Sequence, residues 1–87
     1  TPFVLFRCAE TIRLYLSHEK VPVVLVGSGR ENDYAHDGFS HFCGDDKDFL
    51  YQFPVIHTYW PKKEDEIVSI LSQCIAKPEP TYINLHR

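Results

Sequence analysis

The chain has 87 residues, of which 44% are hydrophobic, and a formal net charge of -3 at pH 7. This length allows one domain with a small core, and the hydrophobic content predicts a folded chain. Nucleic acid is not an expected partner, because the sequence shows no basic segment that could bind phosphates. A membrane segment is not expected either, because no apolar run approaches the roughly 20 residues that span a bilayer.

The three cysteines are Cys8, Cys43 and Cys74, an odd and widely spaced set. Such a set does not predict a disulfide framework and favours a reducing, cytoplasmic location. Cys8 and Cys74 fall on apolar faces of expected helices, so packing explains them. Apolar patterns run up to both ends of the sequence, so we expect residues 1–87 to form a single partial domain of a longer polypeptide.

The first half of the chain predicts a helix, a strand and a long loop. Pro2 favours an extended segment from Thr1 to Phe6. Apolar residues at helical spacing predict a helix from about Leu5 to His18. The charge-free, β-branched run from Val21 to Gly27 predicts a strand buried on both faces. A polar loop follows from Ser28 to Gly44, and its aromatic residues indicate that it is ordered.

The second half predicts two helices that alternate with two strands. Acidic residues ahead of an apolar face predict a short helix from Asp45 to Phe53, and a second acidic first turn predicts a helix that begins after Pro61. The expected strands are Val55–Tyr59 and Thr81–Leu85. The order α-β-α-β-α-β is typical of a three-layer α/β fold with a parallel sheet and right-handed crossovers. Three strands leave open sheet edges, which indicates a missing half or an obligate partner.

The candidate site is the loop after the first strand. In open α/β sheets, ligands bind in the crevice beyond the carboxyl ends of the strands, and this loop carries Asp37, His41 and Asp45. A histidine that titrates near neutrality can donate or accept a proton. Structural readings remain open for all three: His41 as a hydrogen-bonded structural histidine, Asp37 as a turn residue before Gly38, and Asp45 as a helix N-cap.

Two other kinds of site are less well supported by the pattern. His36, His41, Cys43 and the neighbouring aspartates offer metal-ligand types, but their spacing matches no familiar zinc pattern, so no metal site is predicted and His36 is expected to be an exposed loop residue. Gly27-Ser28-Gly29 lacks the third glycine and the following helix of a dinucleotide-binding fingerprint.

The segments PVVLVGSG, HDGFSH and FCGDD, in this order, resemble the pyrimidine-binding domain of transketolase-like thiamine diphosphate enzymes. In that family an apolar strand, a loop, an Asp-Gly-Pro-Thr-His motif and an acidic residue follow one another. Asp37, Gly38 and His41 match the motif, whereas Phe39 and Ser40 replace its proline and threonine. The agreement in order and spacing covers nearly the whole chain and corresponds to the C-terminal half of that domain.

The resemblance implies ketol (two-carbon) or acyl transfer by a transferase that uses thiamine diphosphate, with a small sugar or 2-oxoacid as substrate. By position, His41 would face the reactive thiazolium carbon and Asp37 would contact a substrate hydroxyl. Phe6 or Phe3 would pack against the aminopyrimidine ring, with Phe6 the first choice.

The resemblance also implies substrate-binding arginines and a partner. Arg87 falls where related enzymes place an arginine for a sugar phosphate. Gly29 replaces a phosphate-binding histidine of the family, and the adjacent Arg30 is a second candidate substrate ligand. Such sites lie between domains of two subunits, so a homodimer or heterotetramer with a diphosphate-binding domain or subunit, which holds Mg²⁺, is implied.

Two family features are missing from residues 1–87. The activating glutamate lies upstream of the position of Phe3 in the family, and the diphosphate is bound by a different domain. We therefore do not expect this fragment to be catalytic alone. The alternative is a non-catalytic α/β interaction module, a degenerate or split relative.

Overall fold

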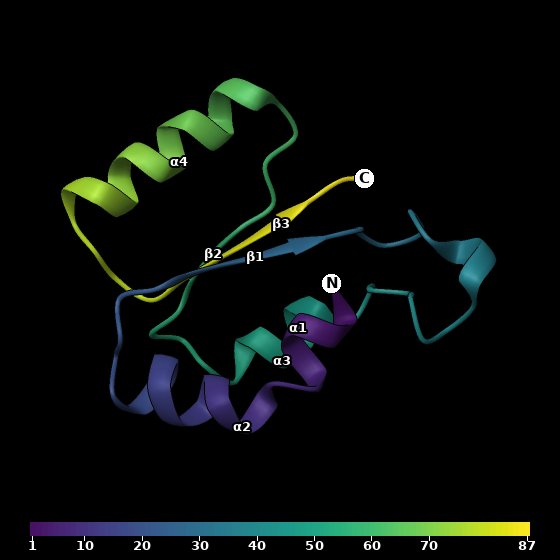
Figure 1. The fold of residues 1–87 in the computed structure, drawn as a ribbon, viewed down its shortest axis with the longest axis horizontal. Helices are drawn as coiled ribbons and strands as arrows, with labels where there is room; N and C mark the ends of the chain where they lie inside the picture. Colours follow the sequence, from purple (N-terminus) through teal and green to yellow (C-terminus); the bar gives the residue numbers. More distant parts are fainter.

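A parallel three-stranded sheet lies between two layers of helices in the computed structural model, which describes residues 1–87 (Figure 1). The strands are β1 (Val24–Ser28), β2 (His57–Tyr59) and β3 (Thr81–Leu85), in the order β1-β3-β2. The helices are α1 (Pro2–Phe6), α2 (Ala9–Thr11), the π-helix η1 (Ile12–His18), the 3-10 helix η2 (Ala35–Asp37), α3 (Asp46–Tyr51) and α4 (Glu64–Ala76). The α/β class, the parallel pairing and the alternation of helices with strands are confirmed.

The start of the chain differs from the prediction. Residues Pro2–Phe6 form α1 rather than an extended segment, with Thr1 at the N-cap. Proline suits the first turn of a helix, because its missing N–H needs no partner there, and its restriction falls on Thr1 outside the helix. The expected continuous helix to His18 is also interrupted, since Arg7 and Cys8 separate α1 from α2 and η1. Cys8 is exposed at this break, so packing does not explain it.

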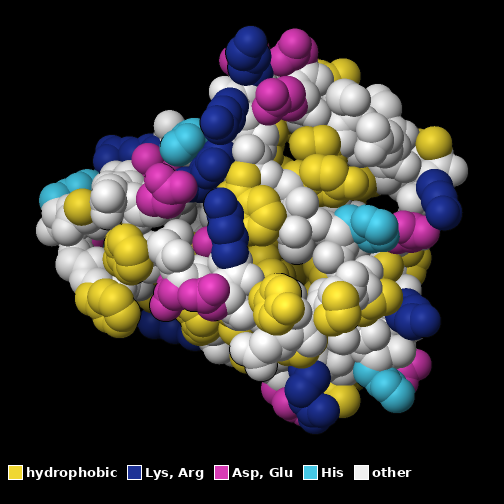
Figure 2. All heavy atoms as spheres, turned by 180° about the vertical axis from the view of Figure 1, so that it is seen from behind, with side chains coloured by type: hydrophobic (Ala, Val, Ile, Leu, Met, Phe, Trp, Pro, Cys, Tyr) yellow, Lys and Arg dark blue, Asp and Glu magenta, His cyan; other side chains and the backbone are white.

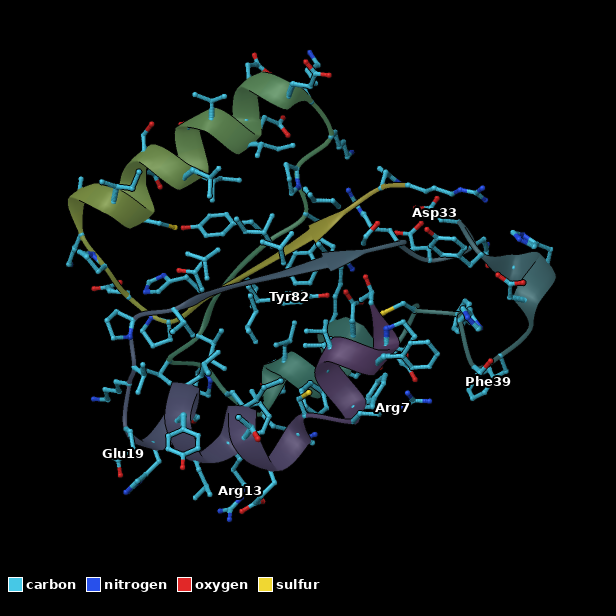
Figure 3. The ribbon with its side chains drawn as sticks, in the orientation of Figure 1. Arg7, Arg13, Glu19, Asp33, Phe39 and Tyr82 are labelled. Carbon is cyan, nitrogen blue, oxygen red and sulfur yellow. The ribbon has the colours of Figure 1, made fainter.

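The main core lies between the sheet and the layer of α1, η1 and α3. Six buried side chains form this core cluster: Leu5, Ile12, Leu16, Leu50, Ile56 and Tyr82. Tyr82 comes from the central strand β3 and lies on the side of the sheet that faces α1 and α3 (Figure 3). Each fully buried side chain of this size contributes about 1.5–3 kcal/mol relative to an exposed one, so this layer supplies most of the hydrophobic stabilisation.

The strand β1 is not buried on both faces, and that prediction is wrong. Val24 is 36% exposed and Val26 is 52% exposed. Their neighbour Leu25 points to the other face and packs against the core cluster. A strand is buried on both faces only if helices cover both of them. Because β1 is an edge strand and is covered on one face, its charge-free sequence did not lead to burial on both faces.

The loop after β1 is ordered by a tight turn and a bridge. Gly29 has a φ of 87°, and a Cβ atom there would lie 2.3 Å from the ring of Tyr34, so only glycine fits under this ring. Further on, Glu31 and Cys43 form an antiparallel β-bridge that brings both ends of the loop together. The prediction of an ordered aromatic loop is therefore confirmed.

The helix α4 is capped by its own sequence. Glu66 accepts hydrogen bonds from the backbone N–H groups of Lys62, at 2.6 Å, and Lys63, at 3.4 Å, and so closes the first turn. These hydrogen bonds hold the pKa of Glu66 below its usual value, and the bond from Lys62 has the largest effect.

None of the helices has both the length and the apolar composition needed to span a membrane. On the face drawn in Figure 2, basic and acidic side chains are interspersed around a central apolar area.

Candidate functional site

Four of the predicted site residues follow the carboxyl ends of strands, and these are Arg30, Asp37, His41 and Arg87. The loop from Gly29 to Gly44 follows β1, Pro61 follows β2 and Arg87 follows β3. Figure 3 shows Asp33 just past the ends of β1 and β3, and Phe39 on the part of the loop that projects from the sheet. This is the edge of a parallel sheet at which ligands bind in open α/β folds.

His41 is held between aromatic rings at this edge. Its ring packs edge-on against Phe3, with the centroids 5.1 Å apart, and lies 6.3 Å from the ring of Tyr34. Ser40 Oγ lies 2.9 Å from His41 Nδ1, and His41 Nε2 makes no hydrogen bond within the chain. The imidazole is therefore oriented by its neighbours and keeps one ring nitrogen free for a ligand.

Asp37 does not act together with His41 in this arrangement. Its carboxylate is exposed at the end of η2 and lies 3.4 Å from His36 Nε2. It makes no hydrogen bond to His41 and accepts none from the backbone, so the turn-stabilising role is also not seen. His36 is exposed, as predicted.

A cavity of about 330 Å³ opens beside α1. Four phenylalanines, with Pro2, Ser40 and Asp45, form what we call the aromatic pocket, and the phenylalanines are Phe3, Phe6, Phe39 and Phe42. Phe3 is the wall that touches His41, whereas Phe6 packs against Phe49 at 5.2 Å between ring centroids. The structure thus places both predicted ring-stacking residues in one pocket and puts Phe3 closest to the histidine.

Asp45 stands at the N-cap position of α3 but does not cap it. Its side chain makes no hydrogen bond to the helix, and its Oδ1 is buried without a partner, although the residue lines the aromatic pocket. The N-cap prediction holds for the position alone. A buried acceptor without a donor is costly, and no hydrogen bond within the chain offsets that cost for this oxygen.

The two predicted arginines have different environments. The guanidinium of Arg87 lies 5.2 Å above the Tyr34 ring and is exposed. Arg30 is only 6% exposed; its Nη1 donates to the carbonyl oxygen of Pro61 at 2.9 Å and its Nε is buried without an acceptor. Arg87 is therefore free to bind an anion, whereas Arg30 is used to join the ends of β1 and β2.

Tyr34 and Asp33 were not identified as site residues from the sequence. Tyr34 covers Gly29 and contacts both His41 and Arg87. Asp33 accepts hydrogen bonds from the backbone N–H of Arg30, at 2.8 Å, and of Arg87, at 3.0 Å. The first of these bonds is the main reason that the pKa of Asp33 lies below its usual value. One signal in the sequence indicated this arrangement, the spacing of five residues between Gly29, which follows β1, and Tyr34.

A buried polar network was also missed. Asp46 is 3% exposed and accepts hydrogen bonds from Trp60 Nε1, at 2.9 Å, and from Asn84 Nδ2, at 2.7 Å. Asn84 Oδ1 in turn accepts the Thr1 hydroxyl at 3.0 Å. The network joins α3 to the carboxyl ends of β2 and β3. It therefore holds in place the elements on which the site loop packs.

The structure offers no metal centre among these residues. No group of three His, Cys, Asp or Glu side chains lies close enough together to hold an ion. Burial, followed by the charge of Asp46, raises the pKa of the Cys43 thiol to about 12. Cys43 is therefore a buried residue whose thiol is protonated at neutral pH.

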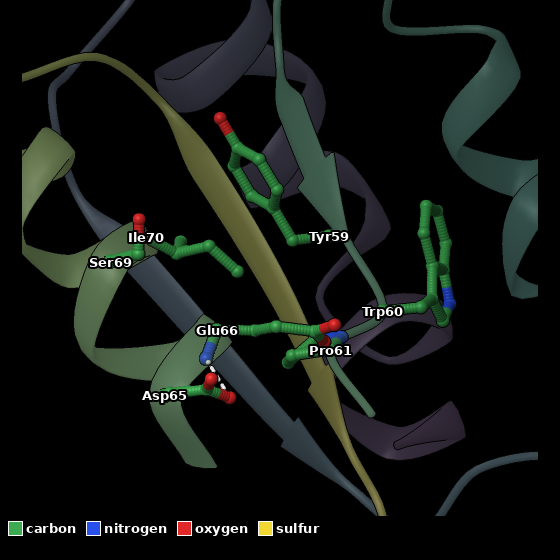
Figure 4. A pocket seen from close by; sticks show the side chains of 7 residues that line it. All are labelled: Tyr59, Trp60, Pro61, Asp65, Glu66, Ser69 and Ile70. Carbon is green, nitrogen blue, oxygen red and sulfur yellow. Dashed lines mark hydrogen bonds between the residues drawn. The ribbon is translucent and has the colours of Figure 1, made fainter. Parts of the chain in front are cut away.

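A second cavity, of about 460 Å³, lies between the end of β2 and the start of α4 (Figure 4). Its lining consists of Tyr59, Trp60, Pro61, Asp65, Glu66, Ser69 and Ile70. None of the predicted site residues lines it, and both of its charged groups are carboxylates, so it does not suit the anionic substrates considered above.

Comparison of the chain with protein-family models, with curated proteins and with solved structures returns no match. What the site does must therefore be argued from its residues and their geometry.

Proposed function

We propose that the chain supplies the pyrimidine-side half of the active site of a thiamine diphosphate-dependent, transketolase-like enzyme that carries out ketol or acyl transfer. The observation that carries this proposal is the position of His41: it packs on Phe3 beside the aromatic pocket, beyond the carboxyl end of β1, and its Nε2 is unbonded.

The aromatic pocket fits a flat heteroaromatic ring that carries an amino group. Phenylalanine rings favour offset or edge-on packing against another ring, and Phe3 and Phe6 supply such walls. Asp45 also lines this pocket and would lie beside a bound ring. When bound, thiamine diphosphate supplies the carbanion chemistry, and the protein supplies orientation and electrostatics.

The residues take separate roles in this proposal. His41 Nε2 holds or transfers a proton at a substrate oxygen. Exposed Arg87 binds an anionic group of a sugar phosphate or 2-oxoacid. Asp37 contacts a substrate hydroxyl without touching His41, and Arg30 is left out because its guanidinium is buried against Pro61.

The diphosphate and Mg²⁺ are assigned to a partner. Following the resemblance, we propose that a diphosphate-binding domain or subunit holds both, within a homodimer or heterotetramer. The three free thiols agree with the cytoplasmic location proposed for this enzyme.

The pyrimidine half of the cofactor gives a direct test without the partner. We expect 4-amino-5-hydroxymethyl-2-methylpyrimidine to shift the backbone amide NMR signals of Phe3, His41 and Asp45. The variant Phe3→Ala should lose these shifts, and Tyr51→Ala, on the exposed side of α3, should keep them. Shifts that are absent, or that spread evenly over the chain, would contradict the cofactor assignment.

The catalytic role needs the assembled enzyme. With the diphosphate-binding partner, thiamine diphosphate and Mg²⁺ present, His41→Ala is expected to slow ketol transfer by about 10²–10⁴-fold, the usual contribution of a positioned acid or base. Unchanged turnover in this variant would remove His41 from the mechanism.

The second candidate is a non-catalytic α/β interaction module. The separation of Asp37 from His41 favours it, because no catalytic pair is preassembled in the chain. This candidate predicts no pyrimidine binding and no activity with any diphosphate-binding partner, so the two experiments above separate the two functions.

A further inference from the structure

The outer edge of β2 has no strand beside it. In the order β1-β3-β2, β2 pairs with β3 alone. The backbone N–H of His57 donates to the carbonyl oxygen of Pro80 at 2.9 Å, on the β3 side. Since the backbone groups of successive residues in a strand point in opposite directions, the N–H and C=O of Thr58 point away from β3. They are available to a further strand.

A largely apolar groove of about 480 Å³ lies beside this edge, on the face of the sheet that carries α3. Its walls are Leu50, Tyr51 and Phe53, from α3 and the residues after it, and Ile56, Thr58 and Trp60, from β2 and its ends. Tyr51 is 87% exposed there. Lys47 Nζ lies 5.1 Å from the centre of the Trp60 ring in the same groove. Apolar side chains therefore suit this groove, whereas Lys47 would repel a lysine or an arginine.

The opposite face of β2 carries negative charge. Figure 4 shows Tyr59 and Trp60 projecting from β2 in opposite directions. Tyr59 lines the cavity of about 460 Å³ together with Asp65 and Glu66 of α4. Asp65 Oδ1 and Glu66 Oε2 accept backbone N–H groups at the start of α4, and the second oxygen of each carboxylate makes no hydrogen bond within the chain. An aromatic ring beside two carboxylates suits the side chain of a lysine or an arginine.

We propose that the free edge of β2 binds an extended segment of a partner protein as a fourth strand, with apolar side chains over α3 alternating with lysine or arginine side chains over α4. A strand added about 4.8 Å from β2 places successive side chains on opposite faces of the sheet, and therefore next to the two different linings. Its main chain pairs with Thr58, and its alternating side chains give specificity, as in other cases of strand addition at a sheet edge. None of the residues assigned to the cofactor takes part, so this inference does not depend on the proposed function.

The probe for this edge is a hexapeptide of alternating leucine and lysine with blocked ends, titrated into the full chain and followed by the backbone amide NMR signals. We expect the signals of Thr58, Tyr59 and Trp60 to shift most. A hexapeptide of alternating leucine and glutamate should bind about ten-fold more weakly, because Asp65 and Glu66 repel its carboxylates.

Two methylated forms of the lysine peptide test whether its main chain pairs with β2. One form carries N-methyl groups on every leucine and the other on every lysine, so each lacks one of the two alternate sets of N–H groups. In an added strand only one of these sets faces β2. One form should therefore lose its binding and the other should keep it, and equal effects of the two forms would contradict strand addition.

Thr58→Pro removes the outward N–H and leaves the bonds between β2 and β3 in place, because proline is tolerated where a strand N–H faces solvent. We expect it to weaken binding by about ten-fold. Val26→Pro is the matched control. The N–H of Gly29 donates to Leu85 on β3, so by the same alternation the N–H of Val26 faces the free edge of β1, and its loss should leave binding at β2 unchanged. Far-UV circular dichroism checks that each variant folds, and the methylated peptides decide the question if Thr58→Pro does not fold.

The charge on the α4 side of this edge is tested separately. Asp65→Lys should weaken binding of the lysine peptide by about five-fold and strengthen that of the glutamate peptide. Glu19→Lys makes the same charge change outside both cavities and should alter neither affinity. A chain that binds neither peptide, or that keeps its affinity for the lysine peptide in both Thr58→Pro and Asp65→Lys, overturns the proposal. Shifts confined to β1 that disappear in Val26→Pro would indicate the other edge of the sheet and would also overturn it.

Discussion

The two faces of the sheet are built for different purposes. One face is fully covered by α1, η1 and α3 and holds both the core cluster and the buried Asp46 network. The other face is covered by α4 over β2 and β3 alone, and β1 stays open there. The difference shows that the covered face supplies most of the stability and supports the site loop, while the half-covered face contributes less.

The strongest test of this comparison is a large-to-small change on each face. Tyr82→Ala, within the core cluster, should lower the free energy of unfolding by about 3–5 kcal/mol. Ile75→Ala, on the exposed side of α4, should change it by no more than about 0.5 kcal/mol. Urea titrations at low protein concentration measure both values, and equal losses would contradict the division between faces.

The buried network should show the next largest effect. Asp46→Ala leaves Trp60 Nε1 and Asn84 Nδ2 without their shared acceptor and should cost about 2–3 kcal/mol of unfolding free energy. Asp46→Asn keeps an acceptor oxygen and should cost less than the alanine variant. If both variants unfold like the wild type in urea, the network is not a structural support for the loop.

Leu25 and Val26 are adjacent in β1 and point to opposite faces of the sheet, so substitutions at the two positions compare how much each face contributes to stability. Leu25 packs against the core cluster, so Leu25→Ala should cost about 2 kcal/mol. Val26 points to the open face, so Val26→Ala should cost about 0.5 kcal/mol or less in dilute solution. A loss for Val26→Ala as large as that for Leu25→Ala would contradict the difference between the faces.

The smallest expected effect is the pH dependence that Asp33 contributes. Its folded pKa is lowered, chiefly by the backbone N–H of Arg30, so the folded state binds the proton less tightly than the unfolded chain does. The associated stability is present above the ordinary carboxyl range, near pH 4, and is lost as the pH falls through the lower folded value. Asp33→Asn should flatten the acid limb of a stability–pH curve, and an unchanged limb would contradict this assignment.

The elements that local sequence specified were predicted well. Thr81–Leu85 became β3 as expected, because its alternating β-branched and apolar residues stand between a proline pair and a polar end. The acidic first turn and the apolar spacing likewise indicated α4. The burial of β1 was mispredicted, since which strands lie at the edge depends on the crossover order, and α1 was missed because proline suits both an extended segment and a first helical turn.

The site was predicted only in part, for a similar reason. The loop position and His41 follow from the strand and the resemblance, but the contact of His41 with Phe3 joins residues far apart in the chain. The partnership of Asp46 with Trp60 and Asn84 also needs three elements in place before it exists. The spacing of residues within one segment carries no information about contacts between segments far apart in the chain. It did show that the loop contains aromatic residues that could pack.

The bond from Arg30 to the carbonyl of Pro61 has a mechanical consequence. The side chain crosses above the end of the central strand and braces the two outer strands against each other. Because Pro61 leads directly into α4, a displacement of that helix pulls on the root of the loop that holds His41. The start of α4 and the ligand edge are thus joined by this guanidinium in addition to the Asp46 network.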